Sequence, residues 1–192
     1  MKIVGLVGSL RKGGNTEILV KESLDAAKEK GAETELIVLH DKKIEPCRNC
    51  DLCFSEECPI KDSVKEIHKK LINADGIIIG SAVHFGDVTG SLKCFMDRCI
   101  TLKRSGMLLK NKVGGGIAVG QAWGHTRTLE TIQHFICGNA MVPASVDIPP
   151  GMGVEVIAGK KGEVSNNSAG LKKARKVGER VVELIDALDF EK

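Results

Sequence analysis

The sequence predicts a single α/β domain in which a five-stranded parallel sheet is covered by helices on both faces. Apolar, β-branched runs alternate with stretches of helical periodicity from one end of the chain to the other. Most of the strand candidates are continuous apolar runs, which is typical of strands that are buried on both faces of a parallel sheet. With 192 residues, of which 42% are hydrophobic and 28% charged, the chain is large enough for one sizeable core.

The first half of the chain contains three strand candidates and two helix candidates. Residues 2–8 (KIVGLVG) form a short β-rich run, and residues 15–31 then show helical spacing that stops at a glycine. Residues 33–40 (ETELIVLH) are the second strand candidate. Beyond a cysteine-rich stretch, residues 62–76 predict a helix that begins with Asp and Ser, both good N-cap residues. Residues 76–82 (GIIIGSA) predict the third strand.

The second half repeats this alternation of strand and helix. Residues 89–103 and 125–139 predict helices, and the fourth strand, at residues 112–120 (KVGGGIAVG), lies between them. Residues 141–148 predict a fifth strand that a proline interrupts, and residues 169–189 predict a closing amphipathic helix. Five units in a chain of this length favour the flavodoxin-like strand order 2-1-3-4-5 over the six-stranded dinucleotide-binding order.

The whole chain, residues 1–192, is predicted to be one domain, because it contains no repeat and no low-complexity linker. A cysteine-rich segment at 41–61 is inserted after the second strand. Residues 149–170 form the one long irregular connection. Long connections in compact domains tend to be either functional or mobile, and both alternatives stay open here.

Composition narrows the classes of partner. A net charge of +3 gives no reason to expect nucleic acid or an anionic membrane. No segment approaches the run of about 18 apolar residues that a transmembrane helix needs. The start, MKIVGLVGSLRK, lacks the apolar run and cleavage site of a signal peptide. We therefore expect a cytoplasmic protein in a reducing compartment, where clustered cysteines serve as metal ligands or catalysts before disulfides.

The first loop at the carboxyl edge of the predicted sheet has the composition of a phosphate site. It reads GSLRKGGNT at residues 8–16 and leads into a helix, so backbone N–H groups and the helix dipole favour an anion there. It is not a Walker A loop, because Gly14 and Asn15 occupy the positions of the Lys and the Ser/Thr. It also lacks the G-x-G-x-x-G of a dinucleotide site. The alternative is a Gly-Ser turn with an ordinary helix cap.

Two further loops meet at the same edge, and each carries one of the few aromatic residues of the chain. Each loop follows an apolar strand and carries a few polar residues, so its surface suits a flat ring with polar edges. The alternative is a solvent-facing loop with a chance aromatic residue. The candidate residues are Ser81, His84, Phe85 and Gly86 after the third strand, and Gly120, Trp123, Gly124 and His125 after the fourth.

These loops, GSLRKGGNT and SAVHFGDVTGSLKCFMDR, resemble those of the NADPH-dependent FMN reductase group of flavodoxin-like proteins. The family usually has Pro at the position of Ala82 and Tyr at the position of His84. The resemblance implies FMN as the cofactor. It implies that the first loop holds the phosphate through Ser9, Arg11, Asn15 and Thr16. It also implies that the second and third loops line the isoalloxazine ring through Ser81, Ala82, His84, Phe85, Gly86, Gly120, Trp123 and Gly124.

The cysteine-rich segment has the pattern C-x₂-C-x₂-C-x₄-C-P, formed by Cys47, Cys50, Cys53 and Cys58. This is close to the C-x₂-C-x₂-C-x₃-C-P run of ferredoxin-type [4Fe–4S] sites, in which closely spaced thiolates wrap one compact cluster. Structural zinc is the main alternative. Zinc sites usually separate two ligand pairs by a dozen or more residues, and this run does not.

The remaining cysteines and three of the histidines receive simpler interpretations. Cys94, Cys99 and Cys137 fall on helical patterns, so we expect buried small hydrophobic side chains there. His40, His68 and His134 lie away from the predicted loops, so we expect them to be solvated or to cap helices.

A flavin-reductase fold with this cysteine pattern resembles the iron–sulfur flavoproteins, a family of electron carriers. The resemblance implies one FMN and one [4Fe–4S] cluster per chain, in a homodimer or homotetramer. It also implies a redox partner such as a ferredoxin, with a small-molecule acceptor possible. The sequence contains no acid–base dyad, so the cofactors carry the chemistry. Two alternatives stay open: an NAD(P)H-dependent FMN or quinone reductase with structural zinc, and a flavin-free metal- or redox-sensing module.

Overall fold

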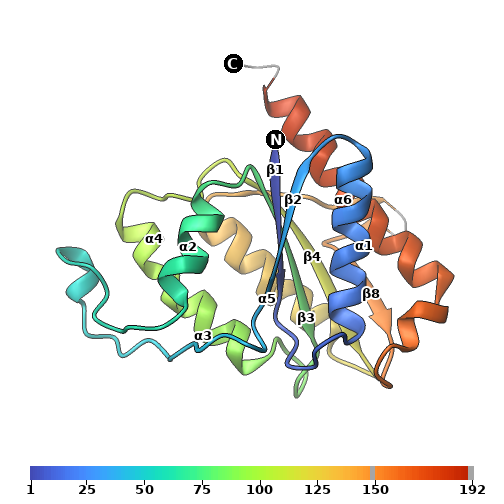
Figure 1. The fold of residues 1–192 in the computed structure, drawn as a ribbon, viewed down its shortest axis with the longest axis horizontal. Coiled ribbons are helices and arrows are strands. Elements are labelled where there is room, and N and C mark those ends of the chain that lie inside the picture. The colour runs from blue at the N-terminus through green and yellow to red at the C-terminus, as the bar shows by residue number, and fades with distance from the viewer. Residues whose placement is uncertain (148–149, 190–192) are drawn as a thin grey trace.

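A computed structural model describes residues 1–147 and 150–189 and confirms the predicted flavodoxin-like fold. The main sheet has the order β2-β1-β3-β4-β5, and every strand pair in it is parallel. Figure 1 shows the strands descending from the N-terminus, so their carboxyl ends meet at the lower edge of the sheet. None of the helices in the described residues is long and apolar enough to cross a membrane.

The helices and strands follow the predicted alternation. The strands of the main sheet are β1 (Lys2–Val7), β2 (Glu33–Val38), β3 (Gly76–Ala82), β4 (Val113–Gly120), β5 (Val142–Pro143) and β8 (Val154–Ile157). The helices are α1 (Asn15–Glu29), α2 (Val64–Ile72), α3 (Gly90–Arg98), α4 (Ile100–Arg104), α5 (His125–Gly138) and α6 (Ser168–Asp189). Short elements complete the chain: the antiparallel pair β6 (Val146–Asp147) and β7 (Pro150–Gly151), and the 3₁₀ turns η1 (Leu52–Phe54) and η2 (Glu163–Asn166).

Side chains from the two faces of each strand enter two separate cores. Ile3 and Val7 of β1 pack with α1 and α6, whereas Val4 and Leu6 pack with α2, α3 and α5. The alternation follows from the two-residue period of a strand. The central strands β1, β3 and β4 are apolar on both faces because both faces of the sheet are covered there, whereas the edge strand β2 keeps Glu33 and Glu35.

The fifth strand differs from the prediction. The segment 141–148 was expected to be one strand, but β5 covers only two residues beside the start of β4, and β8 pairs with the end of β4. Pro143 has no N–H to continue the ladder, so the chain leaves the sheet after it. It returns at Gly153, where φ is +157° and a Cβ would lie 2.5 Å from the Gly116 carbonyl oxygen. Residues 148 and 149, which the predicted strand and the predicted connection at 149–170 include, lie outside the described residues.

The cysteine-rich segment leaves the carboxyl end of β2 and runs outward along one side of the domain. In Figure 1 this blue-to-cyan stretch passes α3 and reaches the far left of the molecule before the chain turns back into α2. Its 3₁₀ turn η1 contacts α4. The segment therefore lies against the α3–α4 corner instead of over the end of the sheet.

Candidate functional site

The three predicted loops meet in one pocket of about 350 Å³ at the carboxyl edge of the sheet. Its walls come from the loop after β1, the loop after β3, the end of β4 and the segment after β8. Seven of the predicted cofactor residues line it: Ser9, Arg11, Asn15, Thr16, Ala82, His84 and Gly120. Ser9, Asn15 and Thr16 are buried, whereas Arg11 is exposed at the mouth. In the wall formed by the loop after β1, every lining residue except Leu10 had been named from the sequence.

The loop before α1 leaves the start of that helix open to an anion. The N-cap residue Gly14 supplies no side-chain hydrogen bond, so the first N–H groups of the helix lack the usual cap. Thr89 donates its hydroxyl to the Gly8 carbonyl oxygen, and the Gly8 N–H donates to the Gly80 carbonyl oxygen. These bonds fix the loop to β3. A phosphate group bound there would face backbone N–H groups and the positive end of the helix dipole.

Sequence reasoning missed the wall that follows β8. Ala158 and Gly159 line the pocket, together with Val83 and Gln121. The Arg11 guanidinium donates to the Gly159 carbonyl oxygen at 3.0 Å through Nη1. The signal was the long connection 149–170. Its function could not be assigned without knowing that β8 adds another carboxyl end beside β4.

The same wall is held in place by two side chains. The Asn15 amide donates to the Lys160 carbonyl oxygen at 2.8 Å, and its oxygen accepts from the Val164 N–H at 3.4 Å. The Glu163 carboxylate accepts from the N–H groups of Gly159 and Lys160, each at 2.8 Å. The Lys160 and Gly159 bonds lower the pKa of Glu163, so this carboxylate stays charged at neutral pH. Asn15 is therefore a residue that organises the pocket as well as lining it.

The aromatic residues of the loops form the rim and lie outside the pocket lining. Phe85 is fully exposed, with φ of +48°, and its ring meets Trp123 edge-on with centroids 6.4 Å apart. A Cβ at Gly86 would lie 2.3 Å from the Trp123 ring, and one at Gly124 would lie 2.5 Å from the Gly86 Cα. The loops after β3 and β4 therefore touch through these four residues. Trp123 and Gly124 also line a neighbouring hollow of about 870 Å³.

Two residues of the predicted rim are buried beneath the loops instead of facing the pocket. Ser81 is fully buried; its hydroxyl donates to the Ala82 carbonyl oxygen at 2.8 Å and accepts from the Thr89 N–H at 3.2 Å. His125 is buried, and its Nε2–H donates to the Gly120 carbonyl oxygen at 3.1 Å. Both shape the loops from behind, and neither lines the 350 Å³ pocket.

The four clustered cysteines line a second pocket, of about 340 Å³. Asn49 and Asp51 adopt positive φ values of 49° and 58°, which turn the chain sharply between the thiols. Such turns suit Asn and Asp, which tolerate the left-handed region better than most residues. The pocket is closed on its inner side by the α3–α4 corner. Cys47, Cys50, Cys53 and Cys58 are all free thiols.

Two arginines from the α3–α4 corner border this pocket. Arg104 donates through Nη1 to the Cys53 sulfur at 2.9 Å and through Nη2 to Asp51 at 3.1 Å. Its guanidinium also stacks 3.6 Å from the centre of the Phe54 ring. Arg98 lines the same pocket from below. These two residues could not be predicted from the cysteine pattern, because they follow the cysteines by about fifty positions.

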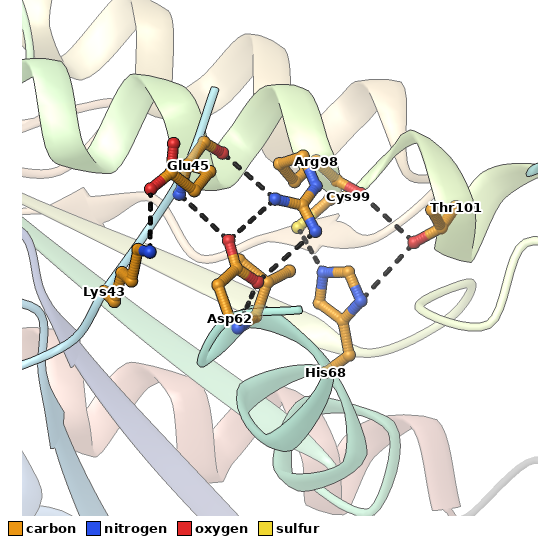
Figure 2. Close-up of polar contacts among 8 residues, drawn as sticks. Lys43, Glu45, Asp62, His68, Arg98, Cys99 and Thr101 are labelled. Carbon is orange, nitrogen blue, oxygen red and sulfur yellow. Dashed lines mark hydrogen bonds and ion pairs between the residues drawn. The ribbon is translucent and has the colours of Figure 1, made fainter. Parts of the chain in front are cut away.

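A buried ion pair closes the base of the cysteine segment, as Figure 2 shows. Arg98 and Asp62 have side chains that are 3% and 1% exposed, and their closest N–O distance is 2.8 Å. Asp62 also accepts from the N–H groups of Glu45 and Val64, and Arg98 donates to the Glu45 carbonyl oxygen. Burial by itself would raise the pKa of Asp62, but the bonds from Glu45, Arg98 and Val64 lower it. The pair thereby ties both ends of the segment to α3.

His68 lies beside this ion pair and is buried, which corrects the expectation that it is solvated. Thr101 donates to the Arg98 carbonyl oxygen, so we assign Nδ1–H of His68 as donor to the Thr101 hydroxyl. Nε2 then accepts from the Cys99 thiol, 3.4 Å away. Burial lowers the pKa of His68 to about 4, and the charge of Arg98 adds to this effect.

Of the three cysteines outside the cluster segment, two differ from the prediction. Cys99 is buried as expected, and burial raises the pKa of its thiol. Cys94 is only partly buried and Cys137 is exposed. The helical pattern alone did not show which of these positions are fully buried.

The chemistry of the cysteine pocket fits an iron–sulfur cluster. Four thiols and the side chains of Arg48, Arg98 and Arg104 line one space, and thiolates are the usual ligands of such clusters. Within the described residues, no three Cys, His, Asp or Glu side chains are yet gathered closely enough to hold a metal ion. Ligand sets that assemble only around their metal are common, so binding would draw these thiols together.

The chain is similar in sequence to proteins that have been described before. Residues 1–148 match the family described as NADPH-dependent FMN reductase. An iron–sulfur flavoprotein of Methanocaldococcus jannaschii is 43% identical over 189 residues, covering 96% of this chain and 97% of that protein. A second one from the same organism is 39% identical over 194 residues, covering 96% and 97%.

Among solved structures, the chain is similar to RosB with a bound 8-demethyl-8-formylriboflavin-5'-phosphate intermediate. The TM-score is 0.79 and the sequence identity 18%, and the match covers 99% of this chain and 81% of that one. At this identity the likeness concerns the fold.

Proposed function

The chain belongs to the NADPH-dependent FMN reductase family and to its iron–sulfur flavoproteins, and on that premise we propose that it is an electron-transfer protein with two cofactors. FMN binds in the pocket formed by the loops after β1, β3, β4 and β8. One [4Fe–4S] cluster binds at Cys47, Cys50, Cys53 and Cys58. When bound, the cluster exchanges single electrons and the flavin exchanges one or two. The pair can therefore couple one-electron transfer to two-electron transfer.

The observation that carries the proposal is the grouping of four thiols around one pocket, which Arg98 and Arg104 of the α3–α4 corner and Arg48 of the segment itself also line. Zinc in tetrahedral thiolate sites is usually wrapped by two separated ligand pairs, whereas here three thiols follow one another at a three-residue period. The positive charge of Arg104, whose ion-pair partner Asp51 is largely exposed, suits a site that carries net negative charge in every oxidation state.

In this proposal, the residues of the flavin pocket bind FMN and orient its ring. The backbone N–H groups at the start of α1 and the Arg11 side chain hold the phosphate. Ala82, His84 and Gly120 border the space for the ring, and Phe85 and Trp123 shield its outer edge. The pocket has a single short anion loop with no second glycine-rich turn for a pyrophosphate. It therefore favours FMN over FAD.

We further propose a cytoplasmic homodimer or homotetramer that takes electrons from a one-electron donor such as a ferredoxin. The acceptor is a second redox protein or a small molecule that reaches the flavin. The absence of an acid–base dyad in the loops supports a carrier in which the protein positions cofactors and transfers no protons of its own.

The metal and flavin content of anaerobically purified protein tests the proposal. Four cysteine ligands at one site predict about four iron and four acid-labile sulfide per chain, with one FMN. Cys50→Ala should abolish the iron and sulfide while the FMN stays bound. Cys137→Ala, at an exposed cysteine outside the pocket, should keep all three.

The contrary outcomes identify the alternatives. Stoichiometric zinc without sulfide, with flavin bound, would indicate a reductase with a structural zinc site. Protein without flavin, whatever its metal, would indicate a sensing module.

A further inference from the structure

Arg104 already makes the contact expected of a residue that acts on a cluster ligand. Its Nη1–H lies 2.9 Å from the Cys53 sulfur, and its orientation is fixed by Asp51 and by the ring of Phe54. Hydrogen bonds to coordinating sulfurs are among the factors that set the reduction potential of such centres. Three partners hold one guanidinium, so its position is determined before any metal binds.

Arg98 approaches the same pocket from the buried side. Two of its nitrogens are used by Asp62 and the Glu45 carbonyl oxygen, but Nε is fully buried and has no partner in the described residues. A buried donor without a partner is costly and needs an explanation. Cys58 and Arg98 line the same 340 Å³ pocket, so the thiolate of Cys58 is the acceptor of matching chemistry nearby.

The charge environments of the two arginines differ. The charge of Arg98 is largely balanced by buried Asp62, whereas Arg104 has, within the described residues, an ion pair with Asp51 alone, which is 62% exposed.

We propose that Arg98 and Arg104 are positioning residues that hold Cys58 and Cys53 for the cluster and raise its reduction potential. The inference rests on the proposed function. One-electron reduction adds one negative charge and breaks no bond, so cations and N–H donors at the ligand sulfurs favour the reduced state. Arg104 contributes charge and a hydrogen bond. Arg98, whose charge is paired, contributes through its hydrogen bond.

A redox titration of anaerobically purified holoprotein, followed by electron paramagnetic resonance, tests Arg104. Arg104→Gln should keep the iron and sulfide but lower the equilibrium constant for cluster reduction about tenfold, which is about 59 mV for a one-electron couple. Arg104→Lys, which keeps the charge but loses the planar fork, should fall between Arg104→Gln and the wild type. Lys103→Gln is the matched control, because it removes one exposed charge from the neighbouring position of α4.

Arg98 is tested by Arg98→Lys, because that change keeps a cation opposite Asp62 while it removes the Nε–H. We expect a lower potential with native circular dichroism, or loss of cluster without loss of fold. If Arg98→Lys unfolds, the Arg104 series decides alone. Wild-type potentials in Arg104→Gln, or a shift as large in Lys103→Gln, would overturn the inference and leave the proposed function intact. Wild-type protein without iron and sulfide would overturn both.

Discussion

At the scale of single residues, Arg11 is the one cationic side chain that lines the flavin pocket within residues 1–147 and 150–189. Arg11→Ala should weaken FMN binding by about 1.5–3 kcal/mol, because a charge-assisted hydrogen bond to the phosphate is lost. The loss of its bond to Gly159 adds to the effect by loosening the wall after β8. Fluorescence quenching of FMN on titration with apoprotein measures the affinity.

The matched control for Arg11 is its neighbour in sequence. Lys12→Ala removes the same charge from an exposed side chain that does not line the pocket. Its FMN affinity should stay within a factor of about two or three of wild type, as for an exposed charge screened by water. Equal losses in the two variants, or no loss in Arg11→Ala, would count against a direct contact of Arg11 with the phosphate.

The free energy of unfolding should depend on pH through the single side chain of His68. Its pKa is about 4 in the folded protein, against an ordinary value of 6.5. Between pH 6.5 and pH 4, His68 is protonated in the unfolded chain but neutral in the folded protein. The free energy of unfolding is therefore unaffected by His68 above pH 6.5 and decreases as the pH falls toward 4. The free energy of unfolding should drop by about 2 kcal/mol from this residue between pH 7.5 and pH 5.

Urea unfolding of metal-free protein at pH 7.5 and pH 5 measures this drop. His68→Gln should be less stable at pH 7.5 but should lose markedly less stability on acidification, because it has no proton to gain. His134→Gln, at an exposed histidine, should keep the wild-type pH dependence. A wild-type pH dependence in His68→Gln would show that other groups are responsible.

The residue-level site was only partly predictable from sequence. The pocket residues of the first loop were found because a glycine-rich turn before a helix has a specific chemistry. Ser81 lies at the carboxyl end of β3, yet it faces inward, because adjacent residues of a strand point to opposite faces and the sequence does not say which. Arg98, Asp62 and His68 could not be found, since their roles arise from contacts more than thirty positions apart.

At the scale of elements, the contact between α1 and α6 depends on Gly178. A Cβ at this position would lie 1.9 Å from the Ser23 carbonyl oxygen of α1, so the two helices would have to move apart. Gly178→Ala should destabilise the protein by about 1–3 kcal/mol or more through overpacking. This outweighs the gain of about 1 kcal/mol that Ala normally brings to a helix interior. Thermal unfolding measures the change.

Gly138 provides the control, because it lies in α5 and a Cβ there would meet nothing within 4 Å. Gly138→Ala should be neutral or stabilising by up to about 1 kcal/mol, as helix propensity alone predicts. If the two substitutions have the same effect, the close approach of α1 and α6 does not limit stability.

The elements show where pattern-based prediction succeeds and where it stops. Strands β1 to β4 were predicted within about two residues, because β1, β3 and β4 are distinctive apolar runs next to glycine and β2 follows the glycine that ends the first helix. The edge strand was predicted as one piece but is divided between β5 and β8. An edge strand has one partner only, so a proline and an excursion of ten residues are tolerated there. That excursion places Gly159 in the flavin pocket.

At the scale of the whole molecule, the two candidate sites lie at different places on the domain. Figure 1 shows the loops of the flavin pocket at the lower edge of the sheet, whereas the cysteine segment reaches the far left, beyond α2 and α4. The segment is fastened there by Arg98 and Arg104 and does not lean over the strand ends. We therefore expect that the cluster of one chain lies next to the flavin of a second copy in the oligomer.

Mixed oligomers distinguish exchange between chains from exchange within one chain. Cys53→Ala chains keep FMN but lack the cluster, and Arg11→Glu chains, dialysed free of FMN, keep the cluster. Each variant alone should show no rapid flavin reduction by a one-electron donor. Co-assembled oligomers should regain it, because cluster and flavin then meet across the interface. Stopped-flow absorbance of the flavin measures the rate.

The controls separate three cases. If only wild-type chains reduce their flavin quickly and mixed oligomers stay slow, the exchange occurs within one chain, and the cysteine segment must move toward the sheet edge when the cluster binds. If Cys53→Ala alone is reduced as fast as wild type, the donor reaches the flavin directly and the cluster is not on the path. Rapid reduction restricted to wild-type and mixed oligomers means that the α3–α4 corner places the cluster for a neighbouring chain. The assembly would then be the smallest unit that transfers electrons.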